Sequence, residues 1–246
     1  MDLMFGVSMV LGIGPALALM WIVMKKYTYP AVEQPFFSDA TFFLLFFCGL
    51  IVGSVLFAVM IMFHLASSMV YMILLAAIQV MVMVVIMNLK RFRGKSDSIF
   101  YGYGLGLGIS CGMSMGIAYT ITSLIKDIEV DASIVILLVI AVTMSMMLGA
   151  CGTTIGEGIA RNRLMEFIFQ ALLFLVAYDL MLYSVLNTGA DGGLAFYGSC
   201  ILMCLLAGGY FYYMMHLKLR NIVREVLKME GKKRSDLRIG PCRSRA

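Results

Sequence analysis

Charged residues are scarce in this chain, and their scarcity excludes the largest class of proteins first. Only 13% of the 246 residues are Asp, Glu, Lys or Arg, whereas 62% are hydrophobic. Soluble domains carry about 25% charged residues, so this chain is not an ordinary soluble domain. We expect it to lie in a lipid bilayer.

Histidine is also scarce, and no cysteine pair is placed for a disulfide. The two histidines, His64 and His216, lie near opposite ends of predicted membrane spans, so one copy of the chain cannot build a histidine-rich metal centre. Five of the six cysteines lie within predicted spans, and Cys242 lies in the C-terminal tail. We therefore expect neither a bound metal nor a cofactor.

Long apolar runs are what the sequence has in abundance. A run of about 20 residues crosses a hydrocarbon core about 30 Å thick. The chain contains seven such runs, at about 3–24, 40–63, 67–89, 98–125, 132–156, 165–187 and 193–217. They predict an all-α polytopic membrane protein with seven transmembrane helices, which form one domain over residues 1–217.

The Lys and Arg residues are confined to alternate loops. They follow the first, third, fifth and seventh runs, and only Lys126 lies in one of the other loops. Because positively charged loops stay in the cytoplasm, we expect the N-terminus outside and the C-terminus in the cytoplasm. The absence of targeting features favours a prokaryotic cell membrane. The net charge of +5 is then a determinant of topology, and it favours membrane lipids rather than nucleic acid as partners.

The segment after the seventh run keeps a helical spacing of apolar residues. Leu219, Ile222, Val223, Val226 and Leu227 predict an amphipathic helix over 218–230 that lies along the membrane surface. Residues 231–246 are basic and polar, and we expect them to be disordered. An alternative interpretation is that this tail is held against anionic lipid.

Glycine organises the fourth run. Within residues 97–119 it recurs every four positions, at Gly104, Gly108, Gly112 and Gly116. On a helix these positions form one stripe without side chains, along which the backbone of a second helix can lie. We predict that this glycine stripe is a helix-packing surface and a candidate binding surface for a partner.

One carboxylate falls in the middle of an apolar run. Asp179 lies near the centre of the sixth run, where an ionised carboxylate costs about 3 kcal/mol. One interpretation is proton or ligand coupling, or recognition of a partner's polar group. The other is a structural carboxyl, protonated or hydrogen-bonded to a hydroxyl group of Tyr178, Tyr183, Ser114 or Thr153.

A second acidic residue lies at the inner end of the fifth run. Glu157 precedes Arg161 by four residues. This spacing favours an ion pair within one helix, so we expect Glu157 to be paired there.

Several short motifs follow one another over about two thirds of the chain. They lie at 14–21 (GPALALMW), 97–102 (DSIFYG), 106–108 (GLG), 149–156 (GACGTTIG) and 177–179 (AYD). In this order and spacing they resemble the PrsW-type family of intramembrane proteases, part of the CAAX-protease-like superfamily. The resemblance implies that family's helical fold.

The resemblance also implies acidic and histidine residues that this chain lacks. The family's Glu–Glu pair, its Glu–Asn, its first histidine and its His–Gly fall on Ala76–Ala77, Met113–Ser114, Met144 and Leu175–Val176. Activating water for peptide hydrolysis needs a general base or a metal ion. Because Ala, Met and Leu supply neither, the resemblance implies a pseudoprotease with no catalytic residue and no metal ligand.

Three functions remain open on the sequence. The first is a non-catalytic PrsW-like protein that binds transmembrane segments or partner membrane proteins, and the second is an active intramembrane metalloprotease. The third is a small transporter or channel that uses Asp179, which predicts inverted repeats or several polar residues along one path; the sequence displays neither. The candidate binding positions are Asp97, Tyr101, Gly104, Gly108, Gly112, Ser114, Gly116, Tyr178 and Asp179.

Overall fold

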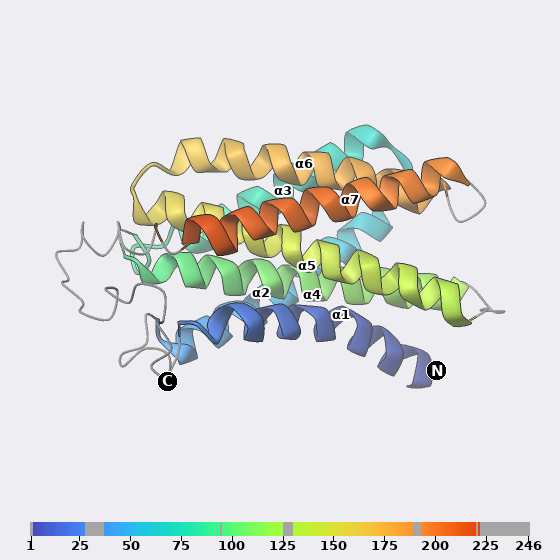
Figure 1. Cartoon of the computed structure of the whole chain (residues 1–246), viewed down its shortest axis with the longest axis horizontal. Helices are drawn as coiled ribbons and strands as arrows, with labels where there is room; N and C mark the ends of the chain where they lie inside the picture. The colour runs from blue at the N-terminus through green and yellow to red at the C-terminus, as the bar shows by residue number, and fades with distance from the viewer. Residues whose placement is uncertain are drawn as a thin grey trace, which may run out of the picture.

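The computed structural model describes residues 2–27, 37–93, 95–124, 130–188, 193–219 and 221. Every regular element in these ranges is helical (Figure 1). In chain order the elements are α1 (Asp2–Met24), α2 (Asp39–Met62), the 3-10 helix η1 (Leu65–Ser67), α3 (Met69–Met87), α4 (Asp97–Leu124), α5 (Val130–Ala160), α6 (Leu164–Thr188), α7 (Leu194–Tyr212) and the π-helical segment η3 (Tyr213–Lys218).

Seven of these helices are long and apolar enough to cross a membrane. The all-helical fold and the seven candidate spans are therefore confirmed over the described residues. The fifth helix is longer than its apolar run and extends to Ala160, and η3 continues the seventh helix to Lys218. The expected amphipathic helix at 218–230 falls mostly outside the described residues, and the tail at 231–246 falls entirely outside them.

Helix α4 is the centre of the bundle. It packs against α1, α2 and α5, and α5 in turn packs against α6 and α7 (Figure 1). In its most apolar stretch 72% of the residues are buried, against 61% or less in the other six spans. Helix α4 can be surrounded so closely because six of its residues are glycine, which lets neighbouring backbones approach.

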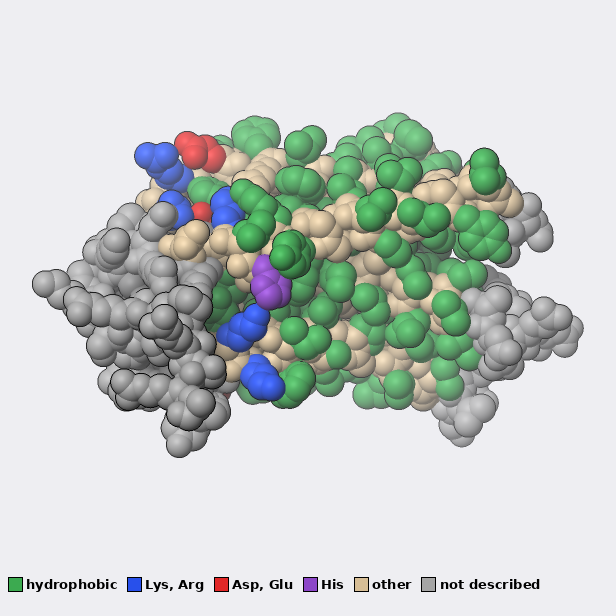
Figure 2. Space-filling view, in the orientation of Figure 1, with side chains coloured by type: hydrophobic (Ala, Val, Ile, Leu, Met, Phe, Trp, Pro, Cys, Tyr) green, Lys and Arg blue, Asp and Glu red, His purple; other side chains and the backbone are tan. Residues whose placement is uncertain are grey.

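The described Lys and Arg side chains gather at one end of the bundle. They belong to the ends and connections of α1, α3, α5 and η3 that meet there, and Figure 2 shows blue side chains at this end of the face in view. This arrangement is the one that the alternating loops predict. We call it the basic end; that it faces the cytoplasm remains a prediction.

Candidate functional site

The glycine stripe of α4 is covered by α2 of the same chain. A Cβ atom at Gly108 would overlap with the backbone at Phe46 and Gly49, and one at Gly112 would overlap with the backbone at Leu50 and Ser54. The prediction of a helix-packing surface is confirmed. As a binding surface for another protein the stripe needs correction, because α2 already lies along it.

The two ends of the stripe meet aromatic side chains of α2. A Cβ atom at Gly104 would meet the ring of Phe42, and one at Gly116 would overlap with the ring of Phe57. The stripe thus holds α2 against α4 along most of the helix length. Its four glycines act as a structural interface.

A second row of glycines joins α4 to α5. Gly102 and Gly106 lie on another face of α4, where a Cβ atom on either would overlap with the carbonyl oxygen of Gly152 or Leu148. Conversely, a Cβ atom at Gly156 would overlap with the backbone at Ser98. Both sets of glycines are visible in the sequence. Only the fold shows that the first set packs against α2 and the second against α5.

Asp97 and Tyr101 lie at the basic end of α4, remote from the middle of the bundle. The phenolic oxygen of Tyr101 accepts a hydrogen bond of 3.1 Å from the backbone N–H of Ser38, and its ring packs edge-on against Phe92. Asp97 is in the first turn of α4, where its Oδ1 lies 3.5 Å from the hydroxyl of Ser96. These two residues therefore tie the connections before α2 and after α3 to the start of α4.

Ser114 faces α1. Its hydroxyl lies 2.6 Å from the carbonyl oxygen of Ser110 and 3.2 Å from that of Gly12. Nearer the start of α4, the hydroxyl of Tyr103 donates to the carbonyl oxygen of Leu19 over 3.0 Å. Ser114 thus belongs to the α1–α4 interface and is not part of a site with Asp179.

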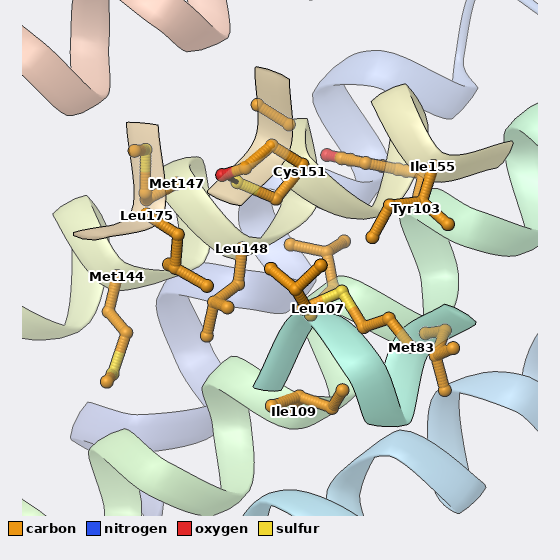
Figure 3. Packing of buried hydrophobic residues seen from close by; sticks show 14 of the residues in the cluster. Met83, Tyr103, Leu107, Ile109, Met144, Met147, Leu148, Cys151, Ile155 and Leu175 are labelled. Carbon is orange, nitrogen blue, oxygen red and sulfur yellow. Dashed lines mark hydrogen bonds between the residues drawn. The ribbon is translucent and has the colours of Figure 1, made fainter. Parts of the chain in front are cut away.

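The four positions that the resemblance assigns to acids and histidines lie in the interior. Ala76 of α3, Met113 of α4, Met144 of α5 and Leu175 of α6 are each 1% exposed or less and belong to one hydrophobic cluster. Figure 3 shows Met144 and Leu175 together among the apolar side chains of this core.

A neighbouring amide completes this region. The side-chain N–H of Gln79, one turn after Ala76, lies 3.2 Å from the sulfur of Met113, while its Oε1 has no hydrogen-bond partner among the described residues. Gln79 therefore joins α3 to α4 at the position where the family would place a glutamate. Apart from this amide, the named positions offer only apolar side chains.

Asp179 is buried in the middle of α6. It is 1% exposed, and its Oδ2 has no hydrogen-bond partner among the described residues. None of the four expected hydroxyl groups donates to it: Tyr178 bonds to Thr143 of α5 at 3.2 Å, and Thr153 donates to its own helix. The hydrogen bond of the structural interpretation is therefore not formed among the described residues, whereas the protonated carboxyl stays a prediction.

Glu157 is paired as its spacing predicts. Its Oε1 lies 2.9 Å from Nε of Arg161, which confirms the predicted ion pair, and its Oε2 lies 3.9 Å from Nζ of Lys218 in η3. The Glu157 side chain is only 2% exposed. Lys218 also lies over the rings of Phe167 and Tyr213, so this carboxylate fastens η3 to α5 at the basic end.

Cys151, Thr154 and Glu157 of α5 and Tyr210 of α7 form what we call the polar seam. The hydroxyl groups of Thr154 and Tyr210 are 2.6 Å apart. The thiol of Cys151 donates to the carbonyl oxygen of Ala171 over 3.6 Å, about two helical turns before Asp179 on α6. Among the described residues no hydrogen bond joins Asp179 to the polar seam, so the absence of a polar path through the bundle stays a prediction.

The polar seam has a pattern that sequence reasoning missed. Cys151, Thr154 and Glu157 follow one another at intervals of three residues, which places them near one face of α5. Tyr210 comes from α7, so only the fold could add it. His64 and His216 are both exposed, outside this seam.

Comparisons with protein-family models, curated protein sequences and solved structures find no match to this chain. Among the residues that the structure describes, no three His, Cys, Asp or Glu side chains are grouped so that they could hold a metal ion.

Proposed function

We propose that this chain is a non-catalytic, PrsW-like membrane protein that binds transmembrane segments of other membrane proteins. The observation that carries the proposal is the burial of Ala76, Met113, Met144 and Leu175, from four different helices, in one apolar cluster. If the resemblance holds, these are the positions where a protease would need its water-activating groups. Side chains that neither take up a proton nor bind zinc fill them instead.

Helix α2 provides the surface that we propose for a partner. Its inner face is fastened to α4, and over the described residues it has no comparable packing against α1 or α3. Four large apolar side chains, spaced three or four residues apart along its outer face, are 57–64% exposed: Leu44, Phe47, Ile51 and Val55. A single partner helix can lie along such a stripe by van der Waals packing.

Site-specific photocrosslinking tests the binding surface. With a photoreactive amino acid at Phe47, we expect adducts with membrane-spanning proteins or a supplied transmembrane peptide. The same group at Leu173 of α6, which is 70% exposed, is the control for random collision in the membrane. Equal yields at Phe47 and Leu173 would contradict a partner surface on α2.

Rebuilding a ligand set tests the resemblance. We expect the combined change Met113→Glu, Met144→His and Leu175→His to bind about one zinc ion per chain, because three ligands suffice for a zinc site with one open position. The natural sequence is expected to bind none. Elemental analysis of the purified, detergent-solubilised protein measures both.

A matched variant places the same three ligands at other buried positions of α4, α5 and α6. In Ile109→Glu, Leu148→His and Leu182→His, which also replace buried residues, no stoichiometric zinc is expected. If the first variant does not yield a monodisperse protein, Met144→His with Leu175→His tests whether side chains at these two positions can bind one zinc ion together. This pair introduces less buried charge. Zinc in the natural protein would contradict the non-catalytic proposal and favour the metalloprotease alternative.

A further inference from the structure

We propose that η3 is a two-register switch, which the ion pair between Lys218 and Glu157 holds in its π-helical register. When the charge of Lys218 is lost, η3 returns to α-helical geometry, and the chain that follows turns about the helix axis by the angle of one residue, about 100°. This inference depends neither on the resemblance nor on the proposed partner. It rests on the hydrogen bonds of η3, on the contacts at its two ends and on the side chains that its turn buries.

The first observation is the hydrogen-bond pattern at the end of α7. The backbone N–H of Tyr213 bonds to the carbonyl oxygen of Gly209, four residues earlier, as in an α-helix. The backbone N–H of Leu219 bonds instead to the carbonyl oxygen of Met214, five residues earlier, and the residues on either side of η3 have α-helical dihedral angles. Segment η3 is therefore a single π turn within a continuous helix, a rare form that accommodates one extra residue.

The second observation is that contacts with α5 and α6 hold the helix on both sides of this turn. Before the turn, the hydroxyl group of Tyr210 lies 2.6 Å from that of Thr154 in α5. At its end, Nζ of Lys218 lies 3.9 Å from Oε2 of Glu157 in α5, and it also lies over the ring of Phe167 in α6. Both contacts can form only if Tyr210 and Lys218 point from the same face of their helix.

The π turn is what brings these two side chains to one face. Lys218 follows Tyr210 by eight residues. In a regular α-helix, with about 100° per residue, Lys218 would lie about 80° around the axis from Tyr210. The extra residue of the π turn reduces this offset to about 20°. The ion pair with Glu157 therefore selects the π-helical register.

The third observation is the arrangement of leucines on either side of Lys218. Leu219 is 1% exposed, whereas Leu217 is 55% exposed. In an α-helical register each residue would take the position that the next residue now occupies, so Leu217 would replace Lys218 beside Glu157. Lys218 would then take the buried position of Leu219. Burying an ammonium group there is costly, so the charge of Lys218 keeps the π-helical register.

The switch would act on the part of the chain that follows Lys218. That part is rich in Lys and Arg, and a one-residue change of register turns its first residues toward a different side of the basic end. A local change of charge can in this way be passed to a neighbouring segment through an element with two packings. We therefore assign to η3 a regulatory role at the basic end.

Replacing Lys218 by leucine tests the proposal. Residues 217–219 are then all leucine, so both registers bury the same side chains and the α-helical one is expected to form. Leu217→Cys or Leu219→Cys provides a probe in the detergent-solubilised full chain, and mass spectrometry measures its rate of reaction with a water-soluble maleimide. With Lys218 present, we expect the cysteine at 217 to react several-fold faster than the one at 219. In Lys218→Leu this order should reverse.

Three further variants separate the register from other effects. Lys218→Arg keeps the charge and should keep the natural order of reaction. Arg163→Leu removes a cation of the basic end whose side chain is 71% exposed, and it should keep that order too. Deletion of His216, an exposed residue of η3, removes the extra residue. Lys218 would then reach Glu157 from a continuous α-helix, so the cysteine at 219 should stay protected.

Each of three results would overturn the proposal. If Lys218→Leu kept the natural order of reaction, the ion pair would not select the register. Fast reaction at both positions in that variant would indicate fraying of the helix instead of a second packing. A reactive cysteine at 219 in the His216 deletion would mean that η3 does not hold one inserted residue, and this variant remains informative if Lys218→Leu does not yield a monodisperse protein.

Discussion

Replacing Gly152 by leucine is expected to prevent the chain from forming a stable bundle. A Cβ atom at this position would overlap with the carbonyl oxygen of Gly102 and press against Gly106. Both contacts are with backbone, so no side chain can rotate away to relieve them. Helices α4 and α5 would have to separate, and α4 is the helix on which α1 and α2 also pack.

The expected loss in the free energy of unfolding is larger at Gly152 than at a glycine with no close neighbours. Overpacking in a core costs about 1–3 kcal/mol and more where the backbone must shift, so we expect at least about 3 kcal/mol for Gly152→Leu and less for Gly152→Ala. Unfolding of the detergent-solubilised protein, followed by circular dichroism during a denaturant titration, measures the loss. The control is Gly209→Leu, because Gly209 of α7 is exposed and has no neighbouring atom within 4 Å of an added Cβ.

The two leucine variants are expected to differ in their free energy of unfolding. Gly209→Leu should leave the free energy of unfolding nearly unchanged, since its side chain would extend into free space. If Gly152→Leu were as stable as Gly209→Leu, the close backbone contact of α4 and α5 would be wrong. The central position of α4 would then need revision as well.

Replacing Glu157 by alanine is expected to produce the second large effect. The change leaves Arg161 and Lys218 as partly buried cations without their shared carboxylate. Removing one partner of a buried ion pair costs about 3–5 kcal/mol. Because the two cations are 27% and 30% exposed and are therefore partly solvated, we expect about 2 kcal/mol.

A second acidic residue on the same end of the bundle provides the control. Glu166 lies 4.0 Å from Arg163, and both side chains are about 70% exposed. Exposed pairs contribute at most about 1 kcal/mol, so Glu166→Ala should change the free energy of unfolding far less than Glu157→Ala. A double variant, Glu157→Ala with Arg161→Ala, should recover part of the loss because it removes an unpaired cation. Equal effects of the two single alanine variants would contradict the burial of Glu157.

Features that depend on near neighbours in the chain could be predicted. The seven helices follow from the lengths of the apolar runs, and the gathering of positive charge at one end follows from the order of the loops. The ion pair between Glu157 and Arg161 follows from a four-residue spacing on one helix. The glycine stripe was also predictable as a packing surface, since its period matches the helix.

The partners of these features could not be predicted, and Asp179 is the clearest example. Its position within a membrane span follows from the apolar run around it, but its burial and its hydrogen-bonding state depend on how the neighbouring helices pack against α6. In the same way, the sequence did not say that α2 would cover the glycine stripe.

By itself, the sequence determined that this chain forms seven apolar helices with one basic end, because helix length and loop charge are local properties. Only the tertiary structure decided that α4 lies at the centre, that its two rows of glycines receive α2 and α5, and that Asp179 is buried with no hydrogen bond to its Oδ2 among the described residues. The reason is the environment in which such helices pack. Residues that face lipid and residues that face the core are equally apolar, so the sequence pattern does not reveal how each helix is rotated toward its neighbours.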